Sequence, residues 1–131
     1  METYELEDQI HAGLTSNAEL MSLLPLGAKS IYHYVAPSIL PTKYPAVVYS
    51  PISDVPLLSG DNREIAHRVT IRIHVITSER ITTAEQEKFL RACKLIRDVM
   101  LNLNFTRRQT TPYVEDGRTM IIYDYERSVE S

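Results

Sequence analysis

Residues 63–77 read REIAHRVTIRIHVIT, which is the clearest structural pattern in the sequence. Polar and apolar side chains alternate along it, which is the pattern of a strand whose successive side chains point to opposite faces of a sheet. The apolar face comprises Ile65, Val69, Ile71, Ile73 and Val75. The polar face comprises Glu64, Arg68, Thr70, Arg72 and His74. We therefore predict one long strand with its apolar face in the core.

The length of this strand is itself informative. At about 3.3 Å per residue it is much longer than a typical strand. We expect it to bend or to project beyond its own sheet, where it could pair with a neighbouring subunit. The polar residues Arg68, Arg72 and His74 are therefore candidate interface residues.

Two helices and two strands are predicted before this stretch. Residues 4–14 place Leu6, Ile10 and Leu14 at helical spacing, and residues 16–19 match a capping box that introduces a second, shorter helix ending near Pro25. The β-branched and aromatic content of residues 30–35 and 44–50 predicts two strands. Pro45 favours an edge position at the start of the second strand.

The segment between the second strand and the long strand is predicted to be irregular. Residues 51–62 contain Pro51 and Pro56, which interrupt regular structure. The same segment carries apolar side chains that a loop would leave exposed, namely Ile52, Val55, Leu57 and Leu58. We expect this loop to bind a partner surface.

One helix and a hairpin are predicted after the long strand. Residues 82–85 match another capping box, and the main helix follows over residues 83–103 with Phe89, Cys93 and Ile96 on its apolar stripe. Residues 105–114 and 119–127 are predicted strands joined by an Asp-Gly turn. The last strand is apolar on both faces, so one face could be covered by another subunit, with Tyr123 and Tyr125 as interface candidates.

These elements predict a single α+β domain over residues 1–131. We expect an antiparallel or mixed sheet of about five strands, with the main helix and the N-terminal helix pair packed on one face. Eight tyrosines and no tryptophan are present, and most of the tyrosines fall in predicted strands. That enrichment is compatible with interfaces, where tyrosine is common, and equally with simple strand propensity.

Composition and motifs speak against several kinds of site. The net charge is −3 with scattered basic residues, so nucleic acid is not expected as a primary ligand. The single cysteine, Cys93, is expected in the core. His67 and His74 lie on opposite strand faces and cannot share a metal ion, while His11 and His33 have no second ligand at suitable spacing.

No enzyme class is indicated either. The chain has no nucleophile elbow, and its four glycines form neither a phosphate loop nor a dinucleotide fingerprint. We predict no catalytic, cofactor-binding or metal-binding residues. There is no leader pattern and no apolar run long enough to cross a bilayer, so a cytosolic protein is expected.

A family resemblance rests on several short stretches taken in order. They are residues 6–10 and 14–20 in the helical region, Ile31 to Tyr34, the Tyr-Pro entry at residues 44–49, and the strand at residues 68–76. The series resembles the tail-completion proteins, also described as tail-terminator or tail-to-head joining proteins, of long-tailed bacteriophages and prophages. The similarity spans nearly the whole chain.

The resemblance implies a structural protein of the virion that is assembled in the host bacterial cytoplasm. Such a protein forms a ring, usually hexameric, which caps the tail tube and docks it onto the head connector. Its partners would be further copies of itself, the tail tube protein and the connector or stopper protein, and DNA would only pass through the lumen. The polar side chains of residues 68–74 could then line the lumen of the ring instead of forming a contact between subunits. The alternative is a small adaptor domain that binds a ligand between the main helix and the sheet, or a peptide at the Tyr44 edge.

Overall fold

The structure is a computed structural model of the chain. It describes residues 1–33, 44–60, 63–78, 82–115 and 117–130, except for the side chains at 58, 59 and 115. The helical elements are α1 (Thr3–Thr15), α2 (Ala18–Leu23), a 3-10 turn η1 (Gly27–Ser30) and α3 (Thr83–Asn102). The strands are β1 (Ile31–His33), β2 (Ala46–Gly60), β3 (Arg63–Ser78), β4 (Thr106–Glu115) and β5 (Arg118–Glu130).

The strands form one mixed sheet in the order β1-β2-β3-β5-β4. The pair β1–β2 is parallel, and the other three pairs are antiparallel. The predicted Asp-Gly hairpin between β4 and β5 is present, with Gly117 at a φ of 72° and Glu115 opposite Arg118. The α+β fold with about five strands is confirmed.

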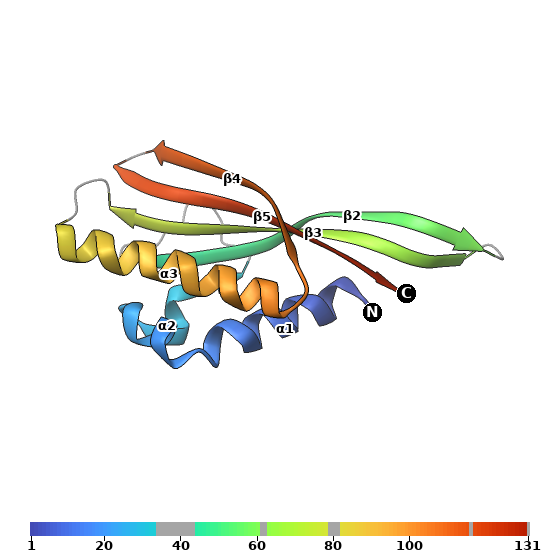
Figure 1. Ribbon diagram of the computed structural model, residues 1–131, viewed down its shortest axis with the longest axis horizontal. Helices are drawn as coiled ribbons and strands as arrows, with labels where there is room; N and C mark the ends of the chain where they lie inside the picture. Colours follow the sequence, from blue (N-terminus) through green and yellow to red (C-terminus); the bar gives the residue numbers. More distant parts are fainter. Residues whose placement is uncertain (34–43, 61–62, 79–81, 116, 131) are drawn as a thin grey trace.

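All helices lie on one face of the sheet, with α3 and α1 running along it (Figure 1). The core lies between these two layers. From α1 it takes Leu6, Ile10 and Leu14, which are completely buried. From β3 it takes Val69, Ile71, Ile73 and Val75, as the alternation predicts, and α3 covers them with the stripe that includes Phe89 and Ile96. The prediction is wrong for Ile65, which is exposed because β3 has passed beyond the helical layer there (Figure 1).

The helix starts agree only partly with the predicted capping boxes. At α3 the Thr82 hydroxyl accepts a hydrogen bond from the Glu85 backbone nitrogen at 3.2 Å, as predicted. At α2 the prediction is wrong by one residue, because Asn17 rather than Ser16 caps the helix. The Asn17 side chain accepts from the Leu20 backbone nitrogen at 2.9 Å, and the Ser16 hydroxyl bonds back to the Gly13 carbonyl.

The predicted loop at residues 51–62 is the largest correction. Residues 51–60 continue β2 without a break, paired to β3 through three register shifts that begin after Pro51, Pro56 and Leu58. The shifts accommodate prolines that cannot donate to a regular ladder. Only residues 61 and 62 of the predicted loop lie outside the described residues. Similarly, β1 is described over Ile31–His33; Ser30 of that predicted strand belongs to η1 instead, and residues 34 and 35 lie outside the described residues.

Candidate interaction surface

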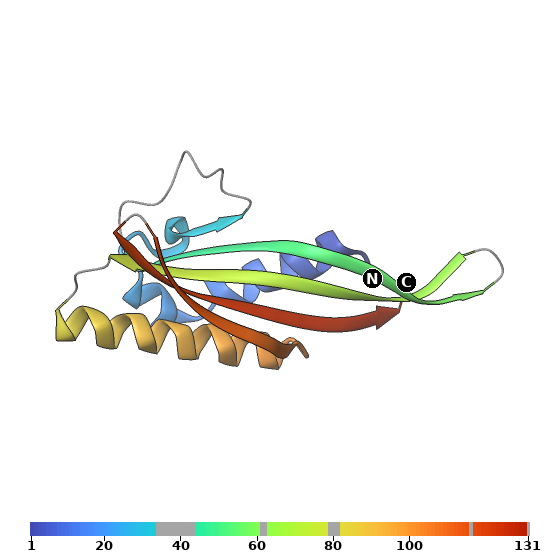
Figure 2. The same ribbon diagram turned by 90° about the horizontal axis from the view of Figure 1, so that it is seen from above.

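The hairpin of β2 and β3 projects well past the helices. We call residues 55–60 and 63–68 the arm. Figure 1 shows the arm leaving the body at the end where both chain termini lie, and Figure 2 shows it extending beyond the tip of β5. Cross-strand pairs such as Val55 with Arg68 and Pro56 with His67 hold the two strands together up to Gly60 opposite Arg63. The long strand therefore projects past β5, but it remains paired with β2 to its first residue instead of leaving its own sheet as predicted.

Large apolar side chains are exposed on and beside the arm. On the arm, Val55 is 48% exposed, Leu57 43% and Ile65 42%, and Ile52 just before it is 45% exposed. Leu58 pairs through its backbone with Ala66, but its side chain lies outside the described part of the structure. Exposed apolar groups gathered on a projecting element are typical of a surface that becomes buried in an assembly.

The outer edge of β2 is a second feature of this surface. β1 covers that edge only at Val47, Val48 and Tyr49. Beyond Tyr49, no strand among the described residues pairs with the outer side of β2. Unpaired strand edges bind other strands readily, and prolines and bulges are the usual devices that restrict such pairing. β2 carries two such prolines, Pro51 and Pro56, and three register shifts against β3.

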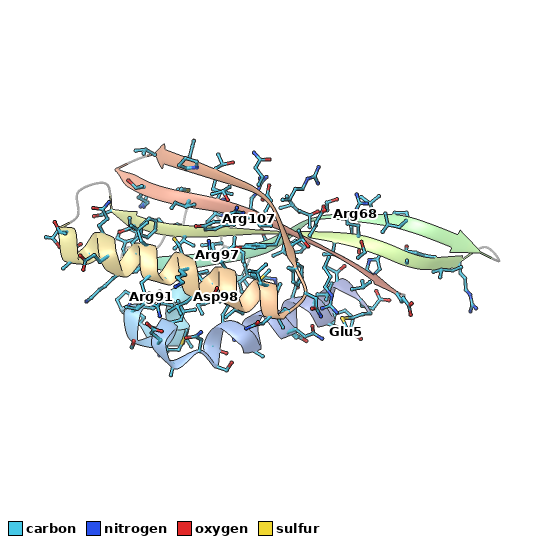
Figure 3. All side chains as sticks on the ribbon, in the orientation of Figure 1. Glu5, Arg68, Arg91, Arg97, Asp98 and Arg107 are labelled. Atoms are coloured by element: carbon cyan, nitrogen blue, oxygen red, sulfur yellow. The ribbon has the colours of Figure 1, made fainter. Side chains whose placement is uncertain are left out.

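The predicted polar row of β3 divides into different environments. Arg68 is exposed on the arm (Figure 3). Arg72 donates two hydrogen bonds to Asp124 of β5, from Nε to Oδ1 at 2.9 Å and from Nη2 to Oδ2 at 3.1 Å. His74 is half-buried, and burial together with the nearby Arg72 lowers the pKa of its imidazole. Its Nδ1 has no hydrogen-bond partner among the described residues.

The prediction that Tyr123 and Tyr125 contact another subunit is corrected by their burial. Tyr123 is 8% exposed and Tyr125 is completely buried, on the sheet face that α3 covers. They lie opposite Ile73 and Ile71, which are core residues. The sequence could not predict which face of β5 is buried, because this strand has a continuous apolar run without alternating polar residues.

A contact that sequence reasoning missed lies where the arm meets the body. His67 is 4% exposed, and its Nδ1 lies 2.6 Å from Asp54 Oδ1 while its Nε2 lies 2.7 Å from the Met1 carbonyl oxygen. Thr3 of α1 donates to the other Asp54 oxygen at 2.6 Å. Asp54 was expected in a loop, so the sequence could not predict that Asp54 pairs with a histidine on the neighbouring strand. His67 and His74 were predicted to lie on opposite faces of the strand, and the burial of His67 on the core face agrees with that prediction.

The same contact contains a possible set of metal ligands. Ligand atoms of Asp54, Glu64 and His67 all lie within 4.8 Å of one another. However, two ligands that each lie about 2 Å from an ion are normally about 3 Å apart. The Asp54–His67 distance of 2.6 Å is shorter and is that of a charge-assisted hydrogen bond. The geometry therefore fits a proton between the two side chains better than a metal ion.

The remaining polar groups show structural contacts. His33 pairs with Glu7 at 3.1 Å and stacks on Tyr49 with ring centroids 4.8 Å apart. On α3, Arg91 donates two hydrogen bonds to the Glu19 carboxylate of α2, at 2.7 and 2.9 Å, and Figure 3 labels Arg91, Arg97 and Asp98 on this helix. A cleft of about 400 Å³ lies between the end of α2, the Tyr44–Pro45 entry to β2 and the start of α3. That cleft is where a ligand of the alternative adaptor could bind.

Comparison with family models and with curated proteins finds no match to this sequence. Within the described parts of the chain, no helix has both the length and the apolar character that a membrane span requires.

Proposed function

We propose that this chain is the subunit of a ring that caps a phage tail tube and joins the tail to the head connector. The observation that carries the proposal is the arm, a projecting hairpin with exposed apolar side chains and an outer edge that no strand of the described residues covers. The family resemblance described above supplies the identity of the ring. The protein acts structurally, and no residue is assigned a catalytic role.

The arm provides what a subunit contact requires. Head-to-tail contacts between identical subunits close into a ring when the rotation between neighbours fits, and they need two different patches on each subunit. The arm is one such patch, and it stands clear of the body that would carry the other. Burying an apolar side chain completely contributes about 1.5–3 kcal/mol, so each half-exposed arm residue contributes less than that. Several arm residues together suffice for a contact that forms only at the high local concentration of an assembling tail.

Assembly is tested by size measurements across a concentration series, with and without the tail tube protein. Ring-sized species, alone or on the tube, are expected from light scattering coupled to gel filtration. A strict monomer under all these conditions that instead binds a metabolite in the cleft near Tyr44 would replace the ring with the adaptor function.

The arm is tested with Leu57→Asp, which places a charge among the apolar arm residues. We expect ring formation and tail joining to be lost, while the free energy of unfolding of the monomer changes by less than about 0.5 kcal/mol, as for other surface substitutions. The matched control is Leu90→Asp on α3, at a side chain that is 51% exposed but far from the arm. Infectious particles from the Leu57 variant would exclude the arm as the contact.

The two roles within this proposal are separated by electron microscopy of tails made without the protein. Tubes of uncontrolled length would assign a terminator role. Tails of correct length that never join heads would assign a joining role.

A further inference from the structure

His67 occupies the junction between the arm and three parts of the body. Its strand β3 continues into the arm, and its ring contacts Asp54 of β2 and the backbone of Met1. Asp54 in turn accepts from Thr3 in the first turn of α1. These hydrogen bonds, centred on one buried imidazole, link the root of the arm to the N-terminal end of the helical layer, in addition to the pairing of residues 66–68 with β5.

The protonation state of this imidazole follows from its two partners. The Met1 carbonyl can only accept a hydrogen bond, so His67 Nε2 must carry a hydrogen. The ionised Asp54 carboxylate also only accepts, so Nδ1 must carry a hydrogen as well. Both bonds are made together only by the imidazolium form. A neutral imidazole has a single N–H and loses one of the two.

We propose that His67 is a proton-controlled latch that fixes the arm to the N-terminal end of the body. When the imidazole is protonated, it bridges Asp54 and the Met1 carbonyl, and the arm is held. When it loses its proton, one bridge breaks and the root of the arm loosens. The latch is independent of ring formation, because all of its contacts lie within one subunit.

Other charged groups near the latch act in both directions, and Glu64 favours the protonated form. Glu64 of β3 lies 3.8 Å from His67 Nδ1. On β5, Val129 lies opposite His67, and the carbonyl of the neighbouring Glu130 accepts a hydrogen bond from the Met1 nitrogen. Two cations lie on the other side of the balance: the α-ammonium of Met1, on the residue whose carbonyl contacts His67, and Arg127 of β5, whose guanidinium donates to Gln9 and to the Leu103 carbonyl.

The carboxylates of α1 take little part in the latch. Glu2 and Glu5 complete the capping box at the start of the helix. Asp54 is therefore the principal counterion of His67. Burial alone disfavours the imidazolium, but the hydrogen bonds to Asp54 and Met1 and the charges of Asp54 and Glu64 outweigh it and raise the pKa of His67.

The sign of the pH dependence follows from these directions. The pKa of His67 is raised above its ordinary 6.5, so its contribution is fully present below pH 6.5 and is lost as the pH rises through the raised value. The pKa of Asp54 is lowered from 3.8, because its bonds to Thr3 and His67 outweigh the opposing effect of burial. Its contribution is present above pH 3.8 and is lost as the pH falls through the lowered value. The latch is closed between these limits.

The test is amide hydrogen exchange of the β2–β3 ladder at residues 55–60 and 63–68, at pH 5.5 and pH 8.5, corrected for the intrinsic effect of pH on exchange. Protection of the wild-type arm should fall at the higher pH, by about tenfold for each unit by which the pKa of His67 exceeds its unfolded value. Equal protection at the two pH values would overturn the latch without any substitution being needed.

Asp54→Asn provides the decisive comparison. Its amide can donate to a neutral Nδ1 while Nε2 still donates to Met1, so the arm of this variant should stay protected at pH 8.5. A fall equal to that of the wild type would contradict the latch. His33→Gln, which changes a histidine paired with Glu7 outside the arm, should retain the wild-type response.

The same exchange measurements, repeated with EDTA and with added Zn²⁺, test whether a metal ion is bound at this contact. The wild-type response should be the same in EDTA and in added Zn²⁺. If protection at pH 8.5 instead depended on Zn²⁺ and disappeared in EDTA, the cluster of Asp54, Glu64 and His67 would hold a cation, and the proton latch would be wrong.

Discussion

The free-energy cost of removing one member of an ion pair depends on how buried the remaining member is. The pair of Arg72 and Asp124 illustrates this dependence. The Asp124 side chain is 12% exposed, whereas that of Arg72 is 41% exposed. Removing the arginine leaves a nearly buried carboxylate without its donor, whereas removing the aspartate leaves a guanidinium that water can reach. The two truncations are therefore not equivalent.

We expect Arg72→Met to lower the free energy of unfolding by about 1–3 kcal/mol and Asp124→Asn by less than about 1 kcal/mol, because an unpaired buried group is the larger penalty. Partial solvent screening of the arginine places the first value near the lower end of its range. Urea denaturation of both variants measures the difference. Equal losses would mean that the carboxylate finds water in the folded state.

Cys93 is a second case in which the environment of one residue determines its behaviour. Burial raises the pKa of its thiol from 9.0 to about 11, although the side-chain hydrogen bond with Tyr123 acts in the opposite direction. The thiolate fraction near pH 8 then falls about a hundredfold. Reaction with a thiol reagent should be slower by at least that factor in the folded protein than in guanidinium. Labelling at the unfolded rate would show that α3 opens readily from the sheet.

The helix starts permit a direct test at the level of elements. Asn17 accepts from the Leu20 nitrogen, whereas Ser16 bonds to the preceding helix. Asn17→Ala should lower the free energy of unfolding by about 1 kcal/mol, the usual effect of losing an N-cap. Ser16→Ala should have almost no effect. A larger loss for the serine variant, measured by thermal or urea unfolding, would restore the capping box predicted from the sequence.

Elements with a clear hydrophobic period could be predicted from the sequence. The second half of β2 could not, because its prolines indicated a loop. The alternation of β3 and the stripes of α1 and α3 assigned the faces of these elements correctly, because period alone fixes a face. Period does not show where the covering layer ends, so Ile65 was wrongly placed in the core. Pro51 and Pro56 in β2 indicated a loop, since the pattern could not show that they lie at register shifts, in a strand whose outer edge beyond Tyr49 has no partner among the described strands. The Asp54–His67 contact depends on that shifted pairing, so it could not be predicted before the register was known.

At the scale of the whole molecule, the arm can be separated from the core. Replacing residues 57–66 with an Asn-Gly turn would join Pro56 and His67, which are already cross-strand neighbours. The removed segment contributes no buried apolar side chain among those described. We expect the shortened protein to unfold within a few degrees of the wild type and to fail to form rings.

Circular dichroism and light scattering check the two parts of this prediction separately. Unfolding of the shortened chain at room temperature would show that the arm is needed for the fold. Rings that still form would show that the subunit contact lies on the body.

β3 pairs with β5 in an uninterrupted register, from Ala66 opposite Glu130 to Ser78 opposite Arg118. This register determines how the molecule responds to a pulling force. Every register shift involving β3 lies on its β2 side. A pull on the arm along its own axis would load the hydrogen bonds of the β3–β5 ladder together, in shear, instead of opening them one at a time. Tension applied to the arm is therefore borne by the longest regular ladder in the described structure.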